Sequence, residues 1–259
     1  DDLGLGDASF GPDPLPRAHE ITPNMKRLAA NGIVLDRHYA HWHCSPSRRS
    51  FLSGRLPIHT DEGLSNEYDD HLDLRWTWIS EKLKDAGYYN VLFGKGHIGL
   101  RSWEHMPLNR GFDEHMGMLG GYADYRATNR WLGLDNWSDD KSYSTLLVGK
   151  AIEDTIRRHF SYSDPDPLFA FLAYQAPHSP VVCPSRAIPE EYARYGQTGT
   201  WPRNCADRMV FALDAEMGYL EAALKEVGQW DNSLIVFSSD NGGSSQHNKE
   251  RGNNFPFRG

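Results

Sequence analysis

Short apolar segments alternate with amphipathic segments along most of the chain, and this alternation constrains the fold more than any other feature. The segment "PLFAFLAYQ" at 167–175 is an almost unbroken apolar run, and "NSLIVFSSD" at 232–240 is a second one. Such runs are typical of strands buried on both faces of a parallel sheet. Strands that alternate with helices predict an α/β fold, in which a mostly parallel central sheet carries helices on both faces.

Further strands are expected at 32–40 ("GIVLDRHYA") and 88–94 ("YYNVLFG"). Helical spacing or capping residues predict helices at 22–32, 76–87, 143–160 and 206–228. In the first of these, Thr22 is the expected N-cap and Pro23 takes the first helical position. The stretch 116–142, rich in Gly, Trp and Asp, is expected to be a long surface excursion.

Length and charge restrict the class of protein. The 259 residues are enough for one large domain with a sizeable core. A net charge of −8 argues against a broad surface for nucleic acid, although a local cationic pocket stays compatible with it. The sequence has no run of 18 apolar residues, so it predicts no transmembrane segment.

The three cysteines leave the redox compartment open. An odd number means that at least one cysteine is unpaired within the chain. Cys183 and Cys205 either form a disulfide, which would imply an oxidising compartment, or stay free thiols. The "NWS" triplet at Asn136–Ser138 is a glycosylation sequon and gives weak support to secretion.

Polar residues follow the predicted strands, at the edge where parallel sheets bind their ligands. They are Lys95 and His97 after 88–94, His178 after 167–175, Asp240 and Asn241 after 232–240, and Asp1 and Asp2 if a strand precedes them. The carboxylates and the amide are hard oxygen ligands that suit Ca²⁺ or Mg²⁺. The cationic and imidazole groups, with Arg48, suit an oxyanion such as sulfate or phosphate.

The segment "HWHCSPSRRS" at 41–50 allows two interpretations. His41, His43 and Cys44 could form a transition-metal clip, but they lack the paired spacing of zinc sites. Alternatively, Pro46 begins a helix, which places Cys44 at an anion-favouring helix N-terminus and Arg48 about one turn further on. The second interpretation fits the polar residues above and makes His41 and His43 structural or rim residues.

Several motifs together resemble the formylglycine-dependent (type I) sulfatase family. "CSPSRRSFLSGR" at Cys44–Arg55 matches the signature C-x-P-S-R followed by Gly-Arg. In the same order as the family, the chain carries "DDLGLGD" at 1–7, "GKGHIG" at 94–99, "APHSPV" at 176–181 and "SSDNGG" at 238–243. The segment 110–125 resembles the arylsulfatase B-like branch, and the similarity runs over nearly the whole chain.

The resemblance implies an alkaline-phosphatase-like fold and hydrolysis of sulfate monoesters, on sulfated sugars or aryl sulfates. Cys44 would be oxidised to formylglycine by a formylglycine-generating enzyme, and the hydrated aldehyde would offer one hydroxyl to attack sulfur and a second to release sulfate. Ca²⁺, or alternatively Mg²⁺, would be held by the modified Cys44 together with four oxygen ligands. These ligands would be Asp1, Asp2, Asp240 and Asn241.

The resemblance also assigns roles to the cationic and imidazole groups. Arg48 would stabilise the hydrate, and His97 would assist its second hydroxyl. Lys95 and His178 would bind the sulfate, with His178 as a proton donor near the leaving oxygen. Arg49 and Arg55 would support the helix that follows Cys44.

Two departures from the family pattern stand out. Gly96 replaces the usual Trp of G-K-W-H, which predicts a looser loop. The family has a second sulfate-binding lysine shortly after N-x-P-x-R-G, and here "NFPFRG" at 254–259 ends the chain. We therefore expect residues 1–259 to be a partial N-terminal catalytic domain that lacks the first strand and the small C-terminal domain, from a secreted, lysosomal or periplasmic enzyme.

Two alternatives remain at this stage. The same scaffold could cleave phosphate or phosphonate esters, in which case phosphoesters would be hydrolysed faster than sulfate esters. A catalytically inactive relative could bind sulfated glycans without turnover, and an unmodified Cys44 would indicate this.

Overall fold

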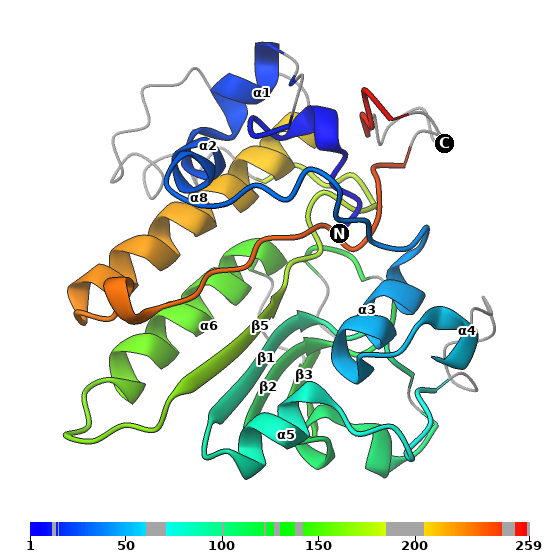
Figure 1. The fold of residues 1–259 in the computed structure, drawn as a ribbon, viewed down its shortest axis with the longest axis vertical. Coiled ribbons are helices and arrows are strands. Elements are labelled where there is room, and N and C mark those ends of the chain that lie inside the picture. Colours follow the sequence, from blue (N-terminus) through cyan, green and yellow to red (C-terminus); the bar gives the residue numbers. More distant parts are fainter. Residues whose placement is uncertain are drawn as a thin grey trace. The chain divides into compact units, whose positions relative to one another are not determined.

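A computed structural model describes residues 1–11, 14, 16–60, 71–99, 101–121, 123–126, 130–137, 142–184, 205–244 and 252–257. The chain divides into two compact units (Figure 1). Unit 1 comprises Asp1–Ala40 with Ala176–Gly259, and unit 2 comprises His41–Gln175. Each unit is described by itself.

Unit 2 contains a five-stranded sheet with the strand order β4-β3-β2-β1-β5. The strands are β1 (Tyr89–Lys95), β2 (Glu114–Met118), β3 (Arg130–Leu132), β4 (Asp135–Trp137) and β5 (Leu168–Ala173). β1 pairs in parallel with β2 and with β5, whereas β3 pairs antiparallel with both β2 and β4. Four of the five described strands therefore run in the same direction, which agrees with the predicted mostly parallel sheet.

The helices of unit 2 cover both faces of this sheet (Figure 1). They are α3 (Cys44–Ser53), α4 (Pro57–Thr60), α5 (Ile79–Asp85) and α6 (Ser144–His159), with short 3-10 turns at Trp103–His105 and Pro107–Asn109. On one face, Leu52 of α3 and Leu92 of β1 join a core cluster around Trp78, which is completely buried. On the other face, α6 buries Val148, Ile152 and Ile156. Successive side chains along a strand point to opposite faces of the sheet, so burying the apolar residues of a strand requires helices on both faces.

Unit 1 is built on helices. They are α1 (Pro16–Ile21), α2 (Pro23–Ala30) and α8 (Cys205–Glu226), with 3-10 turns η1 (Leu5–Asp7) and η4 (Trp230–Asn232). The predicted helix at 22–32 is confirmed, but Thr22 does not cap it with its side chain. Its hydroxyl donates to Ala18 O instead, and the Asp214 carboxylate of α8 accepts the free N–H groups of Asn24 and Met25 at 3.0 and 2.8 Å.

Two predicted strands are wrong. Residues 32–40 and 232–240 lie outside the described strands, and both belong to unit 1, whereas the sheet belongs to unit 2. Ile33 and Leu234 are each 89% exposed. Apolar and β-branched residues favour extended backbone, but a strand exists only where a neighbour completes its hydrogen-bond ladder, and composition does not specify that neighbour.

Two other expectations need correction. The stretch 116–142 is more than a surface excursion, because it contains the end of β2 and the hairpin of β3 and β4. The segment 167–175 does form a strand, β5, but it is the edge strand of the described sheet and most of its residues are only half-buried. An edge strand lacks one neighbour, so its apolar residues are less enclosed than those of a central strand.

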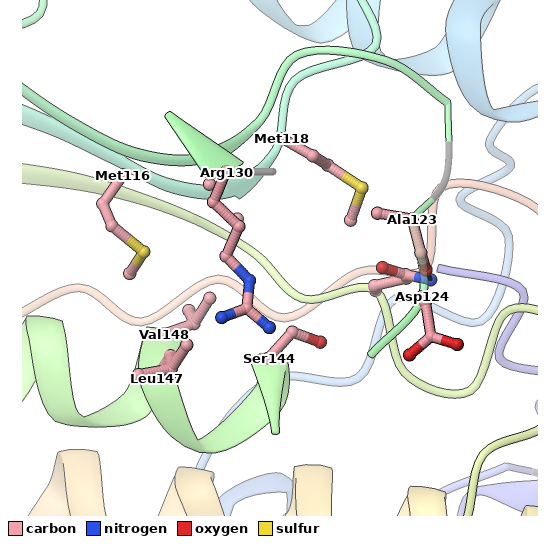
Figure 2. A pocket seen from close by; sticks show the side chains of 11 residues that line it. Met116, Met118, Ala123, Asp124, Arg130, Ser144, Leu147 and Val148 are labelled. Carbon is pink, nitrogen blue, oxygen red and sulfur yellow. Dashed lines mark hydrogen bonds between the residues drawn. The ribbon is translucent and has the colours of Figure 1, made fainter. Parts of the chain in front are cut away.

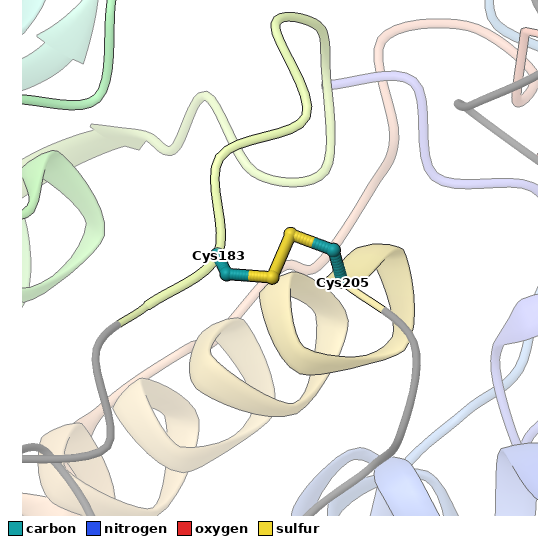
Figure 3. The surroundings of a disulfide bond; sticks show 2 residues. All are labelled: Cys183 and Cys205. Atoms are coloured by element: carbon teal, nitrogen blue, oxygen red, sulfur yellow. A yellow bond between two sulfur atoms is a disulfide. The ribbon is translucent and has the colours of Figure 1, made fainter.

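The alternative left open for Cys183 and Cys205 is decided in favour of a disulfide (Figure 3). The bond joins the segment after His178 to the first residue of α8, with a sequence separation of 22. Cys44 is the free cysteine, and it is buried. Among the described residues, we find no helix that is both long and apolar enough to span a membrane.

Candidate active site

Cys44 is the first residue of α3, as the second interpretation of the signature predicts. His43 precedes the helix in extended conformation, and Pro46 lies in the first turn, where its missing N–H has no intrahelical partner to lose. The helix ends at Gly54, which adopts a left-handed conformation (φ 65°) and donates its N–H to Ser50 O at 2.8 Å. Cys44 is only 2% exposed, so its side chain lies in the interior at the positive end of the helix dipole.

Arg48, one turn into α3, reaches the end of β1. Its Nη1 donates to the main-chain oxygen of Lys95 at 2.8 Å. Arg48 is 5% exposed and Lys95 is completely buried, so two cationic side chains are enclosed at the carboxyl end of β1. Arg49 is also buried and donates to Thr60 O at 3.1 Å, which fits its predicted role in supporting the helix.

The loop after β1 is shaped by glycine. Gly94 has φ 110°, and a Cβ there would lie 2.1 Å from Ala173 O on β5, so a larger residue would break the β1–β5 contact. The N–H groups of Gly96 and His97 then donate to Met118 O and Leu119 O at 2.8 and 2.9 Å. A Cβ at Gly96 would meet its nearest atoms at 3.4 Å, so the main chain at this position leaves room for a Cβ.

Burial and positive neighbours determine the protonation of His97. Burial lowers the pKa of His97 most, and the nearby charges of Lys95, Arg48, His43 and Arg49 lower it further, to about 2. His97 is therefore neutral at physiological pH and offers a lone pair or a single N–H rather than a charge. Within unit 2, the structure brings together Lys95, Arg48 and His97. The start of α3 belongs to the same unit.

Asp1, Asp2 and His178 of unit 1 each offer a ligand atom, and these atoms lie within 4.8 Å of one another. The Nδ2 of Asn241 donates to Asp2 Oδ1 at 2.5 Å and to Gly242 O at 2.9 Å. In this orientation Asn241 Oδ1 is a buried oxygen that has no hydrogen-bond partner among the described residues. A cation is the natural partner for such an oxygen beside two carboxylates, so the donor set fits a divalent metal.

Asp240 lies next to this group, and its role as a metal ligand stays a prediction. It is absent from the group of ligand atoms within 4.8 Å, and its Oδ1 accepts the N–H of Asp2 at 3.4 Å. The main chain here is held by Ser239, whose Oγ accepts from Leu3 N and donates to Asn241 O. Asp2 itself has φ 56°, a left-handed conformation that is costly for a residue other than glycine.

His178 lies beside the carboxylates. Its Nδ1 is 2.6 Å from Ser179 O, a carbonyl that can only accept, so Nδ1 carries the proton. In its neutral form the ring would offer a lone pair at Nε2, which lies 3.9 Å from Asp2 Oδ2. The sequence predicts that His178 binds sulfate and donates a proton to the leaving oxygen. Its position makes it a candidate metal ligand as well, because a fixed Nδ1–H is the usual arrangement of metal-binding histidines.

Two aromatic residues close to Cys44 received no functional role from the sequence. His43 was expected to be a structural or rim residue, and its ring centroid lies 6.1 Å from that of His97. Trp42 is 63% exposed, and its ring centroid lies 5.3 Å from that of His43. The signal in the sequence is the position of Trp42, two residues before Cys44.

A separate hollow in unit 2 contains none of the predicted site residues. Figure 2 shows Met116, Arg130, Leu147 and Val148 around it. Arg130 is 5% exposed, and its Nη2 donates to Tyr125 O and Ser142 O at 3.0 and 2.9 Å. The guanidinium therefore ties the segment before β3 to the segment before α6, which is a structural role.

Comparisons with known proteins agree with these motifs. A family model described as Sulfatase matches residues 1–258. Arylsulfatase J of Mus musculus is 33% identical over 279 residues, covering 100% of this chain and 44% of that protein. N-acetylgalactosamine-6-sulfatase of Mus musculus is 30% identical, covering 99% of this chain and 52% of that protein.

Solved structures show the same fold. The structure of Ps i-CgsB in complex with k-i-k-neocarrahexaose has a TM-score of 0.76 and 27% identity, and the match covers 99% of this chain and 59% of that one. A sulfatase from Pseudoalteromonas sp. has a TM-score of 0.70 and 21% identity, with 93% and 53% covered.

The chain belongs to the sulfatase family. It spans about half the length of the curated relatives that it matches.

Proposed function

We propose that the protein to which this chain belongs hydrolyses sulfate monoesters, with residue 44 in its formylglycine form as nucleophile. The observation that carries the proposal is the Cys44 signature at the start of a helix whose Arg48 binds the main chain of a buried Lys95. Membership of the sulfatase family supports the same reaction. As formylglycine, residue 44 would supply a hydrated aldehyde hydroxyl in place of a thiol.

In this proposal the residues of unit 2 prepare the site for an anion. Lys95 and Arg48 supply fixed positive charge where the sulfate oxygens gain charge in the transition state. His97, neutral because of burial and these same cations, can accept a hydrogen bond from a hydroxyl of residue 44 and so orient it. A protonated imidazole could only donate hydrogen bonds and could not orient the hydroxyl in this way.

The residues of unit 1 would hold a divalent cation. Asp1, Asp2 and Asn241 supply oxygen ligands, with Asp240 beside them and His178 Nε2 as a further donor, and oxygen-rich donor sets favour Ca²⁺ over transition metals. When bound, the cation would supply positive charge for the nucleophile and the sulfate. A further role of His178, proton donation to the leaving oxygen, belongs to the same proposal.

A sulfated sugar is the proposed class of substrate. Trp42 presents an exposed indole two residues before Cys44, and such flat apolar faces suit the C–H face of a sugar ring. One similar structure holds the oligosaccharide k-i-k-neocarrahexaose, and one relative is named N-acetylgalactosamine-6-sulfatase. Phosphate and phosphonate esters are the competing substrates that the assay must include.

The proposed location is an oxidising compartment, secreted, lysosomal or periplasmic. The disulfide of Cys183 with Cys205 supports this location, because disulfides persist mainly outside the reducing cytosol. A formylglycine-generating enzyme would act on Cys44 during maturation, and the catalytic domain proposed for residues 1–259 would be part of a longer protein.

The test is expression of the full natural protein together with a formylglycine-generating enzyme. The mass of the peptide containing Cys44 reports conversion, and turnover is measured on an aryl sulfate, a panel of sulfated sugars and matched phosphate esters. We expect conversion, and loss of nearly all sulfatase activity in Cys44→Ala. Equal turnover by the variant, or faster turnover of phosphate esters, would contradict the proposal. An unconverted Cys44 with glycan binding alone would indicate the inactive relative.

A further inference from the structure

Residues 252–254, here called the asparagine clamp (Gly252, Asn253 and Asn254), contact both acidic motifs of unit 1. We propose that the clamp is a positioning device that sets the spacing of the proposed metal ligands Asp1, Asp2 and Asn241. This inference rests on the metal site in the proposed function, and no residue of the clamp is itself a proposed ligand.

The clamp binds the first motif through main-chain groups. Gly6 donates its N–H to Asn253 O at 2.8 Å, and Asn253 donates its own N–H to Asp7 Oδ2 at 2.8 Å. The packing is so close that a Cβ on Gly4 would lie 2.2 Å from Asn253 O. Asp7 is buried, and Arg17 donates to its other oxygen at 2.5 Å. Asp7 therefore anchors the clamp to the first motif through one carboxylate oxygen, while Arg17 holds the other.

The clamp binds the second motif through the Asn254 side chain. Its Oδ1 accepts the N–H of Gly243 at 2.7 Å, and its Nδ2 donates to Gly243 O at 2.9 Å. Gly252 adds a bond from its N–H to Ser244 O at 3.1 Å. A Cβ on Gly252 would lie 2.5 Å from Gly243 Cα, so the two main chains touch. The paired amide bonds fix both the distance and the orientation of the segment that carries Asn241.

The clamp would hold the two acidic motifs together against the repulsion between their carboxylates. Asp1, Asp2 and Asp240 bring like charges together, and without a cation these carboxylates repel one another. The two motifs are joined directly by the bond from Asn241 to Asp2, between residues 239 positions apart. Asparagine main-chain and amide groups add further links without adding negative charge. The ligands are thus held near their bound spacing before the metal arrives, which favours tight binding.

The experiment measures metal binding directly, on the full protein. Ca²⁺ affinity is determined by calorimetry, and Tb³⁺ luminescence lifetime reports how many waters remain on the bound ion. We expect Asn254→Ala and Gly252→Ala each to weaken Ca²⁺ binding about tenfold, from the loss of two hydrogen bonds or of close packing. We also expect shorter Tb³⁺ lifetimes, because a looser ligand set admits water.

Asn232→Ala is the matched control, since Asn232 is an exposed asparagine of the same unit whose side chain bonds only Gln229 among the residues that the structure describes. It should bind both ions as the wild-type protein does. If Asn254→Ala and Gly252→Ala bind Ca²⁺ with unchanged affinity and unchanged Tb³⁺ lifetime, the clamp has no positioning role. If the wild-type protein binds no Ca²⁺, the metal site of the proposed function is wrong, and this inference is overturned with it.

Discussion

His97 illustrates, at the scale of a single residue, how a site can keep a base neutral among cations. The histidine is enclosed by the protein and lies near Lys95, Arg48 and His43, each of which disfavours a second positive charge. A histidine in water would be partly protonated near neutral pH, whereas this one is not.

We expect Lys95→Met to raise the pKa of His97, because Lys95 is the neighbouring charge that lowers this pKa most. The pKa should stay below its ordinary value, since burial, the main cause, persists. The measurement is an NMR titration of ¹³C-labelled histidine. His115 is an internal control, because burial alone lowers its pKa, to about 4, and Lys95 has no part in that shift. An unchanged pKa of His97 beside an unchanged His115 would contradict the electrostatic explanation.

Trp42 is the residue on which the proposed class of substrate can be tested. We expect Trp42→Ala to raise the KM for a sulfated oligosaccharide about two- to twelvefold, the range given by loss of about 0.5–1.5 kcal/mol of aromatic contact. The kcat should change little, because the indole would bind sugar and not the sulfur. Trp103, 60% exposed and outside the signature, supplies the control variant Trp103→Ala. Equal effects of the two substitutions would argue against a sugar platform at Trp42.

At the scale of elements, the N-terminus of α2 is capped by a residue of α8. Asp214 is fully buried and accepts main-chain N–H groups from Asn24 and Met25, together with the Asn24 side-chain amide. Burial nevertheless raises the pKa of Asp214 to about 6, above the ordinary value of 3.8, and the hydrogen bonds offset only part of this. The cap therefore carries an energetic cost once the carboxyl is ionised.

The sign of the resulting pH dependence follows from proton counting. Between about pH 4 and 6 the folded protein holds the Asp214 proton more tightly than the unfolded chain, so the free energy of unfolding falls as pH rises through this range. The predicted contribution is about 3 kcal/mol, at roughly 1.4 kcal/mol per pKa unit. Above pH 6 the contribution should be constant.

Urea denaturation at pH 4, 5, 6 and 7 tests this prediction in Asp214→Asn, which keeps one oxygen acceptor and removes the charge. The difference in free energy of unfolding between wild type and variant should shrink or change sign as pH rises. The free energy of unfolding of Asp231→Asn, a substitution at an exposed position of η4, should change with pH in the same way as that of wild type. A parallel curve for Asp214→Asn would mean that Asp214 has an ordinary pKa in the folded state.

At the scale of the whole molecule, covalent and hydrogen-bonded links join segments of unit 1 that are distant in sequence. The disulfide joins Cys183 to Cys205, and the asparagine clamp joins residues 4–7 to residues 243–244. The buried Cys44 takes no part in these links.

Loss of the disulfide should lower the free energy of unfolding by about 3 kcal/mol, the loop-closure value for a separation of 22 residues. The comparison is urea denaturation of the Cys183→Ser/Cys205→Ser double variant against wild type, each with and without a reducing agent. The reducing agent should destabilise wild type and Cys44→Ala equally and leave the double variant unchanged. Equal stability of wild type and the double variant would mean that the bond contributes nothing to the folded state.

Much of the fold could be predicted from local patterns. Helical spacing or capping residues located α2, α5, α6 and α8, and the apolar run 88–94 located β1, because these signals are local in the sequence. The segments 32–40 and 232–240 have equally strand-like composition but are not strands in the structure. Composition describes what a segment could do in a sheet and not whether a neighbour is present to pair with it.

The sequence by itself identified the chemical groups on which the proposed function rests: the signature of Cys44, the proposed oxygen ligands of the two acidic motifs, and the cations of 48 and 95. Local motifs carry this information because each reactive group is defined by its residue type and its immediate chain neighbours. Only the tertiary structure decided which partners act on these groups. Asp214 caps a helix 190 residues away, Asn254 binds Gly243, and His97 loses its charge to burial. Hydrogen bonding, packing and desolvation all depend on distance in space, which the order of residues does not record.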